Sequence, residues 1–179
     1  ITVREDFPSA RPGLTNVARF VGTVSPAPDG QRVTVVARGD VFTVPAKDGP
    51  TRNLTQTQGV HERNATWSPD GKLIAYLSDA TGEFELYVRP QDGKGAATQL
   101  TSNNDTYPFP PSWSPDSKKL AYYQFDESKV KDFYLALDQT KLQTKLDTEA
   151  YPKVGTDNPV VDLVVYDIAS KKSTRIDVR

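Results

Sequence analysis

One turn motif occurs three times in this chain, and an apolar run follows each copy. The copies lie at residues 27–30 (Ala-Pro-Asp-Gly), 67–71 (Trp-Ser-Pro-Asp-Gly) and 113–117 (Trp-Ser-Pro-Asp-Ser). Their aspartates stand at positions 29, 70 and 116, which are 41 and 46 residues apart. A period near 40 residues is typical of structures built from repeated units that pack against their neighbours. The chain is therefore predicted to be a series of similar units.

The motif has the residues that a tight turn requires. Proline sets φ for the first central position of a type I turn, aspartate suits the second, and glycine follows where a positive φ is favoured. The third copy has Ser117 where the first two have Gly30 and Gly71. If the turn keeps its geometry there, mild backbone strain is expected at Ser117.

The second repeat shows the content of one unit most clearly. Strand-like runs occupy residues 65–68, 73–78, 84–89 and 99–101, with turn residues between them. Four short strands per repeat are typical of a propeller blade. We therefore predict an all-β fold, a partial β-propeller of about three four-stranded blades of the WD40-like (PD40) kind. Three blades are too few to close a ring.

The repeats divide the chain, which we treat as a single partial propeller spanning residues 1–179. The expected parts are a lead-in at 1–19, blade one at 20–58, blade two at 59–105 and blade three at 106–179, with an insertion at 126–159. Trp67 and Trp113 precede two of the turns and are expected to pack between adjacent blades. Stacking on a ligand is the alternative role for these two rings.

The insertion in blade three is difficult to assign from its pattern. Apolar residues at helical spacing favour a helix that starts near Asp126 or Ser128. These apolar residues are Val130, Phe133, Tyr134, Leu137, Leu142 and Leu146. The later stretches 151–155 and 158–159 contain proline and glycine and must be extended or turning.

The composition excludes several classes of function. There are 22 Lys and Arg against 23 Asp and Glu, a net charge of −1, so a nucleic-acid partner is not expected. No apolar run approaches the roughly 18–20 residues of a membrane helix, so no membrane span is expected either. The chain has no cysteine and one histidine, which argues against a transition-metal site.

A search for catalytic residues yields no candidate. No Gly-x-Ser-x-Gly elbow occurs, and any Ser-His-Asp arrangement would have to use His61, the single histidine. His61 lies in a predicted loop, where a surface or inter-blade hydrogen-bonding role is favoured over a catalytic or ligand-binding one. Asp79 and Glu83 lack the dense acidic spacing of a calcium loop. We therefore assign no catalytic, cofactor-binding or metal-binding residue, expect no cofactor, and predict that the chain is not itself an enzyme.

The repeat signature at residues 67–76 resembles the propeller repeat shared by tricorn-type proteases, Tol-system periplasmic propellers and the dipeptidyl peptidase IV family. Residues 10–123 resemble an amino-terminal propeller of bacterial tricorn protease homologues, and about 106–179 resemble the dipeptidyl peptidase IV propeller. The pieces that carry the two resemblances are 10–15, 42–47, 52–55 and 59–63 for the first, and 124–130, 151–155 and 158–159 for the second. The second resemblance implies that the insertion is largely extended and irregular rather than helical.

The resemblance also implies a function, with one departure. Dipeptidyl peptidase IV proteins carry paired glutamates before the equivalent of Trp113 that hold a substrate's amino terminus, but residues 103–111 contain no glutamate. What remains is a non-catalytic propeller portion of a serine peptidase that gates or docks peptide substrates. The alternative is a free-standing protein-protein interaction module of the Tol-system type.

The expected partners and location follow from the same comparison. The partners are a peptide or protein, further propeller blades or a hydrolase domain, and a second copy, because open-ended blades expose apolar faces and strand edges. The expected location is periplasmic or secreted, with the cytoplasm as the alternative.

Overall fold

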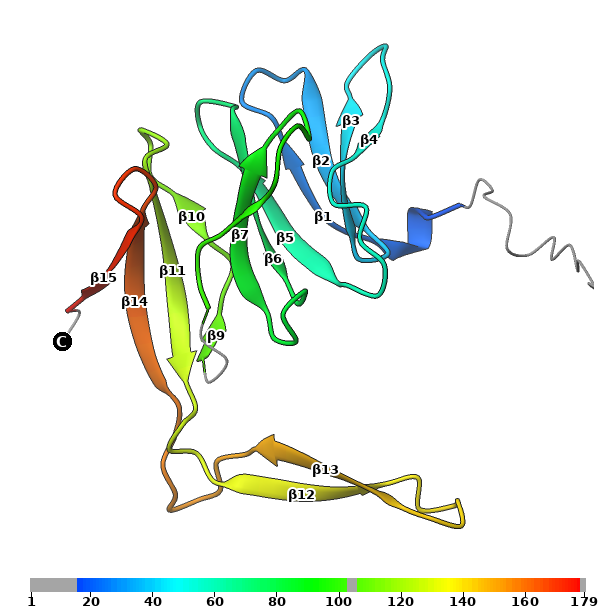
Figure 1. The fold of residues 1–179 in the computed structure, drawn as a ribbon, viewed down its shortest axis with the longest axis vertical. Coiled ribbons are helices and arrows are strands. Elements are labelled where there is room, and N and C mark those ends of the chain that lie inside the picture. The colour runs from blue at the N-terminus through cyan, green and yellow to red at the C-terminus, as the bar shows by residue number, and fades with distance from the viewer. Residues whose placement is uncertain (1–15, 103–105, 178–179) are drawn as a thin grey trace, which may run out of the picture.

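Three antiparallel sheets stand side by side, and a separate two-stranded hairpin projects from the third (Figure 1). The structure is a computed structural model that describes residues 16–102 and 106–177. Most of the expected lead-in lies outside these residues, and its described end includes a short 3-10 helix, η2 (Ala18–Phe20). The expected all-β partial propeller is confirmed.

The first two sheets are four-stranded meanders, and we call them blade one and blade two. Blade one comprises β1 (Val21–Pro26), β2 (Arg32–Ala37), β3 (Asp40–Pro45) and β4 (Arg52–Asn53). Blade two comprises β5 (Glu62–Trp67), β6 (Leu73–Ser78), β7 (Glu85–Pro90) and β8 (Thr98–Gln99). Both follow the strand order of the chain, as expected from the turn residues between the runs.

The third sheet, blade three, has the same plan with a divided first strand. Its members are β9 (Thr106–Pro108), β10 (Ser112–Trp113), β11 (Lys119–Asp126), β14 (Val160–Asp167) and β15 (Lys172–Ile176). Both β9 and β10 pair with β11, one with each end of it. Pro110 and Pro111 lie between them and cannot donate to the ladder, which explains the break.

The repeated turns have one geometry in all three blades. The last residue of each turn has a positive φ, which is 67° at Gly30, 71° at Gly71 and 60° at Ser117. The strain expected at Ser117 is thus confirmed, because a side chain rarely adopts this region. In blades two and three the serine before the proline donates to the turn aspartate, and this bond is the main reason that the pKa values of Asp70 and Asp116 lie below the ordinary value.

Two apolar cores lie between the blades. Between blades one and two the main buried side chains include Val36, Val41, Trp67, Ile74 and Tyr76. Between blades two and three they include Ala75, Leu77, Leu86, Val88, Leu120, Tyr122, Val164 and Tyr166, with Trp113 packed against them. The odd- and even-numbered residues of β6 therefore face different neighbours, which is how a central blade buries both faces. The expected inter-blade packing of both tryptophans is confirmed.

The helix predicted from the pattern of the insertion is wrong. Residues 132–150 form a hairpin of β12 (Asp132–Leu137) and β13 (Lys145–Ala150), paired from Asp132 with Ala150 to Leu137 with Lys145. The run from Phe133 to Leu137 is apolar throughout, so it fits a strand period as well as a helical one. The extended form implied by the family resemblance is what the structure has, and it is more regular than expected.

Within the described ranges, the structure has no helix that is long and apolar enough to span a bilayer.

Candidate functional site

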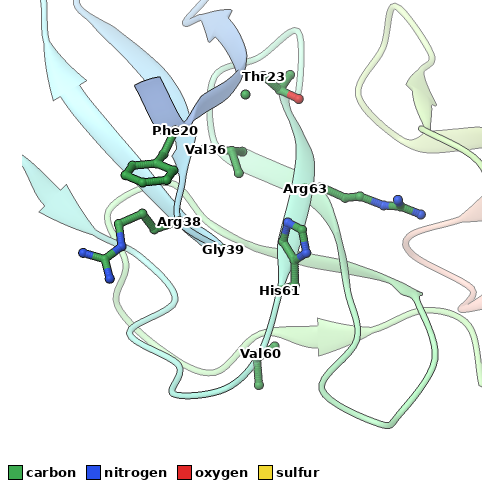
Figure 2. A pocket seen from close by; sticks show the side chains of 9 residues that line it. Phe20, Thr23, Val36, Arg38, Gly39, Val60, His61 and Arg63 are labelled. Carbon is green, nitrogen blue, oxygen red and sulfur yellow. The ribbon is translucent and has the colours of Figure 1, made fainter. Parts of the chain in front are cut away.

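A hollow of about 400 Å³ opens between blades one and two, where the first strands of both blades begin (Figure 2). Its lining combines aromatic and aliphatic side chains with two arginines and the single histidine. The lining residues are Phe20, Gly22, Thr23, Val36, Arg38, Gly39, Val60, His61 and Arg63. None of these residues has a carboxylate, so the ionisable side chains of the wall are those of Arg38, His61 and Arg63.

Gly39 brings the two blades together at the floor of this hollow. The Glu62 amide donates to the Gly39 carbonyl at 2.7 Å, across the junction. Gly39 has a φ of 87°, and a Cβ at this position would lie 2.9 Å from the Val60 carbonyl oxygen. A larger residue would therefore force the turn of blade one away from the start of blade two.

His61 is held by its backbone and presents its ring to the hollow. Its amide donates to Asp79 Oδ1 at 2.6 Å, and its ring meets the Phe84 ring edge-on with 6.0 Å between centroids. In the part of the chain that the structure describes, the His61 ring makes no hydrogen bond to a serine hydroxyl or a carboxylate. Both partners belong to blade two, so the surface or inter-blade hydrogen-bonding role expected for His61 stays a prediction, as does its lack of a catalytic role.

The two arginines of the hollow point to opposite sides of it (Figure 2). The Arg63 guanidinium lies over Phe84, 3.7 Å from the ring centroid, and burial lowers its pKa while Asp79 opposes that shift. Arg38 sits in the left-handed region at a φ of 55°, with its guanidinium 5.9 Å from the Phe20 centroid. The site thus offers apolar walls with cationic edges.

Glu62 is a buried carboxylate at the same junction that sequence reasoning missed. It is 1% exposed, and its Oε1 accepts from Thr57 at 2.8 Å and from Ser78 at 3.4 Å. Its Oε2 is buried without a hydrogen-bond partner among the described residues. Burial raises the pKa of Glu62, and nearby Asp40 raises it further, while the hydroxyl donors lower it.

A second hollow, of about 310 Å³, lies between blades two and three, at the place that Glu62 occupies between blades one and two. Position 108, which follows Glu62 by the 46-residue repeat, is a proline, so no carboxylate enters from the first strand of blade three. The wall carries Thr101, whose hydroxyl donates to the buried Glu85. Thr55 donates to Asp40 in the same way in blade one, at 3.1 Å.

The sequence contains a signal from which this recurring acid-threonine pair could have been predicted. Asp40 and Glu85 each start the third strand of a blade, and Thr55 and Thr101 each follow a leucine at the end of that blade. A repeat alignment of those positions would have identified the pair. Among the described residues, no group of three or more His, Cys, Asp or Glu side chains could hold a metal ion.

Comparison with known proteins agrees with both sequence resemblances. Residues 109–179 match the family described as the dipeptidyl peptidase IV (DPP IV) N-terminal region. Tricorn protease homolog 2 of Streptomyces coelicolor is 34% identical over 88 residues, which are 48% of this chain and 8% of that protein. The expected tricorn-like and dipeptidyl peptidase IV-like character is confirmed.

Solved structures support the same fold. The dipeptidyl peptidase 4 of Porphyromonas gingivalis aligns with a TM-score of 0.69 at 20% identity, over 88% of this chain and 26% of that one. A protein of Agrobacterium tumefaciens described as TolB aligns with a TM-score of 0.58 at 18% identity, over 84% of this chain and 47% of that one. This chain therefore spans less than half of each of these three proteins, and it is an all-β partial propeller similar to the amino-terminal propeller regions of tricorn-type and dipeptidyl peptidase IV-type peptidases.

Proposed function

We propose that this chain is the non-catalytic propeller portion of a serine peptidase of the tricorn or dipeptidyl peptidase IV type, and that it docks or gates peptide substrates. The observation that carries the proposal is the match of residues 109–179 to the dipeptidyl peptidase IV N-terminal region. The chain also covers only 26% of the dipeptidyl peptidase 4 of Porphyromonas gingivalis, with which it aligns. Bond cleavage would then belong to another part of a longer protein.

The hollow between blades one and two is the feature best suited to docking. Its aromatic and aliphatic walls can receive a peptide side chain, and Arg38 at its edge can meet a peptide carbonyl or carboxylate. Gly22 leaves room in it, because the closest atom to a Cβ built there is the Val36 carbonyl oxygen at 3.8 Å.

Fluorescein-labelled peptides from a casein digest test this function. The wild-type chain should raise their fluorescence anisotropy, while mass spectrometry shows that the peptides remain intact. Gly22→Phe fills the hollow and should weaken binding at least tenfold, whereas Thr148→Phe on the exposed hairpin should not. Peptide cleavage that His61→Ala abolishes would contradict the proposal, and so would binding that Gly22→Phe leaves unchanged.

A free-standing interaction module of the Tol-system type is the second candidate, favoured by the alignment with the protein described as TolB over 84% of this chain. In that case the chain would capture a folded protein partner and show no preference for short peptides. Pull-down with the isolated chain, in competition with the casein peptides, separates the two functions.

The remaining proposals concern partners and location. Apolar side chains remain exposed on both outer blades, including Val24 on blade one and Tyr123 on blade three. We propose that further blades, a hydrolase domain or a second copy covers them. The Tol-type alternative is consistent with the proposed periplasmic or secreted location.

A further inference from the structure

Both blade junctions contain the same directional hydrogen bond. The Trp67 indole of blade two donates to the Ser25 carbonyl of blade one at 3.1 Å. The Trp113 indole of blade three donates to the Thr66 carbonyl of blade two at 3.4 Å. Ser25 and Thr66 hold the same position, one residue before the end of the first strand. Blades two and three thus each bind the preceding blade with a tryptophan, and blades one and two each offer the acceptor carbonyl.

The face that receives a following blade can be read from blade two. Four side chains of β6 and β7 are almost completely buried against blade three, and they are Ala75, Leu77, Leu86 and Val88. Strand pairing gives their counterparts in blade three, which are Ala121, Tyr123, Leu163 and Val165. Tyr123 is 54% exposed there, whereas its counterpart Leu77 is fully buried.

Blade three also repeats the acceptor position. Ser112 precedes Trp113 as Thr66 precedes Trp67, and it pairs with Ala121 as Thr66 pairs with Ala75. The same register therefore directs the Ser112 carbonyl toward the open side of the blade. Ile176, the counterpart of Leu100, borders this side and is 38% exposed.

We propose that the outer face of blade three is a docking surface for a further four-stranded blade whose first strand ends in tryptophan. The tryptophan would cover Tyr123 and donate to the Ser112 carbonyl, as Trp67 and Trp113 do at the two junctions inside the chain. This inference concerns the order of blades and stands whether or not the propeller docks peptides.

A second copy of this chain fits the same surface poorly. In a head-to-tail contact blade one would dock there, and it has Pro26 where blades two and three have tryptophan. It also has Val44 where blade two has Arg89, whose guanidinium donates to the Leu54 carbonyl across the junction. Neither Pro26 nor Val44 has a side-chain donor, so a copy would bring apolar contact without either hydrogen bond.

Variants that turn blade one into a tryptophan-bearing blade test the proposal. Pro26 is exposed, so Pro26→Trp adds the missing indole without disturbing a core. Sedimentation equilibrium should show a self-association constant at least tenfold higher than for wild type or for Pro26→Phe, which adds a ring without the donor. Val44→Arg restores the second donor and should raise the constant independently. Adding Tyr123→Arg to either variant should return it to the wild-type value.

Three results would overturn the proposal. The first is equal association of Pro26→Trp and Pro26→Phe, together with no effect of Val44→Arg. The second is a gain that survives Tyr123→Arg. The third is strong association of the wild-type chain that Tyr123→Arg abolishes, which would make a second copy the occupant. Circular dichroism of each variant confirms that the sheets are retained before association is compared.

Discussion

The Ser117 hydroxyl accepts a hydrogen bond from the Asp70 amide at 2.9 Å, and this bond joins the turn of blade three to the turn of blade two. Ser117 stands where the other two turns have glycine, at a φ of 60°. The inter-blade bond therefore offsets backbone strain that a glycine would avoid.

This relationship predicts an order of stability among variants. Ser117→Ala keeps the strain and loses the bond, so it should unfold at lower urea than wild type, with a loss of about 1 kcal/mol. Ser117→Gly loses the bond but relieves the strain, and should be more stable than the alanine variant. Gly30→Ser is the matched control, because it adds strain where a Cβ meets no atom within 4 Å. An alanine variant as stable as the glycine variant would contradict this explanation.

The two tryptophans should differ in what their indole N–H contributes. Trp67 is 7% exposed and its hydrogen bond is 3.1 Å long, while Trp113 is less buried and its bond is 3.4 Å long. Trp67→Phe should cost about 1–3 kcal/mol of unfolding free energy, because it leaves a small void and removes one of the two side-chain hydrogen bonds that the Ser25 carbonyl accepts, the other coming from the Thr34 hydroxyl at 3.0 Å. Trp113→Phe should cost less. Equal costs in urea unfolding would mean that the indole bonds do not determine junction strength.

Glu62 should make stability depend on pH in a direction unusual for a carboxylate. Its pKa is raised by burial, so the native state holds this proton more tightly than the unfolded state. Its contribution is then greatest below the ordinary pKa of 4.5 and is lost as pH rises through the raised native value. The facing titratable groups are Asp40 and Tyr76, and the pKa of Tyr76 is raised to about 12 by burial, so Tyr76 stays neutral throughout this window.

Glu62→Gln removes this titration and isolates its effect. Urea unfolding between about pH 4.5 and 7.5 should show the difference between wild type and Glu62→Gln changing with pH, with wild type losing stability relative to the variant as pH rises. Asp70 and Asp116 have lowered pKa values and titrate below this range, so they do not interfere. A difference that is constant across the range would show that Glu62 is not held protonated by the fold.

The hairpin should be removable without loss of the blades. The Tyr151 amide donates to the Lys131 carbonyl at 3.1 Å, so the ends of the hairpin are already adjacent. Replacing residues 132–150 with Asn-Gly, a favoured two-residue turn, should leave the unfolding free energy within about 1 kcal/mol of wild type. Urea unfolding followed by circular dichroism measures this free energy, and a deletion variant that does not fold would contradict the prediction.

The repeats made the blades predictable because local turn chemistry sets each strand boundary. The run after each Pro-Asp turn became the second strand of its blade. The hairpin was not predictable from pattern, because five consecutive apolar residues from Phe133 fit either period. No local signal decides between helix and strand in this segment, which projects from its blade (Figure 1).

The candidate site was less predictable, because it depends on which residues the junction brings together. His61 was noted in the sequence, but Phe20 and Arg38 come from another blade and carry no local signal. Glu62 reads as an ordinary loop acid beside His61, and only packing against Thr57 and Ser78 buries it. The Asp40 and Glu85 pairs with threonine were the exception, since repeat alignment could have found them.

The central claim is that successive blades lie side by side and that blades two and three each bind the preceding blade through a tryptophan. The chain has two tryptophans, so nuclear Overhauser effects from their two indole N–H protons test it directly. The account predicts cross-peaks from Trp67 to protons of Ser25 and from Trp113 to protons of Thr66. Indole protons that exchange rapidly with water and show cross-peaks only within their own blade would contradict it.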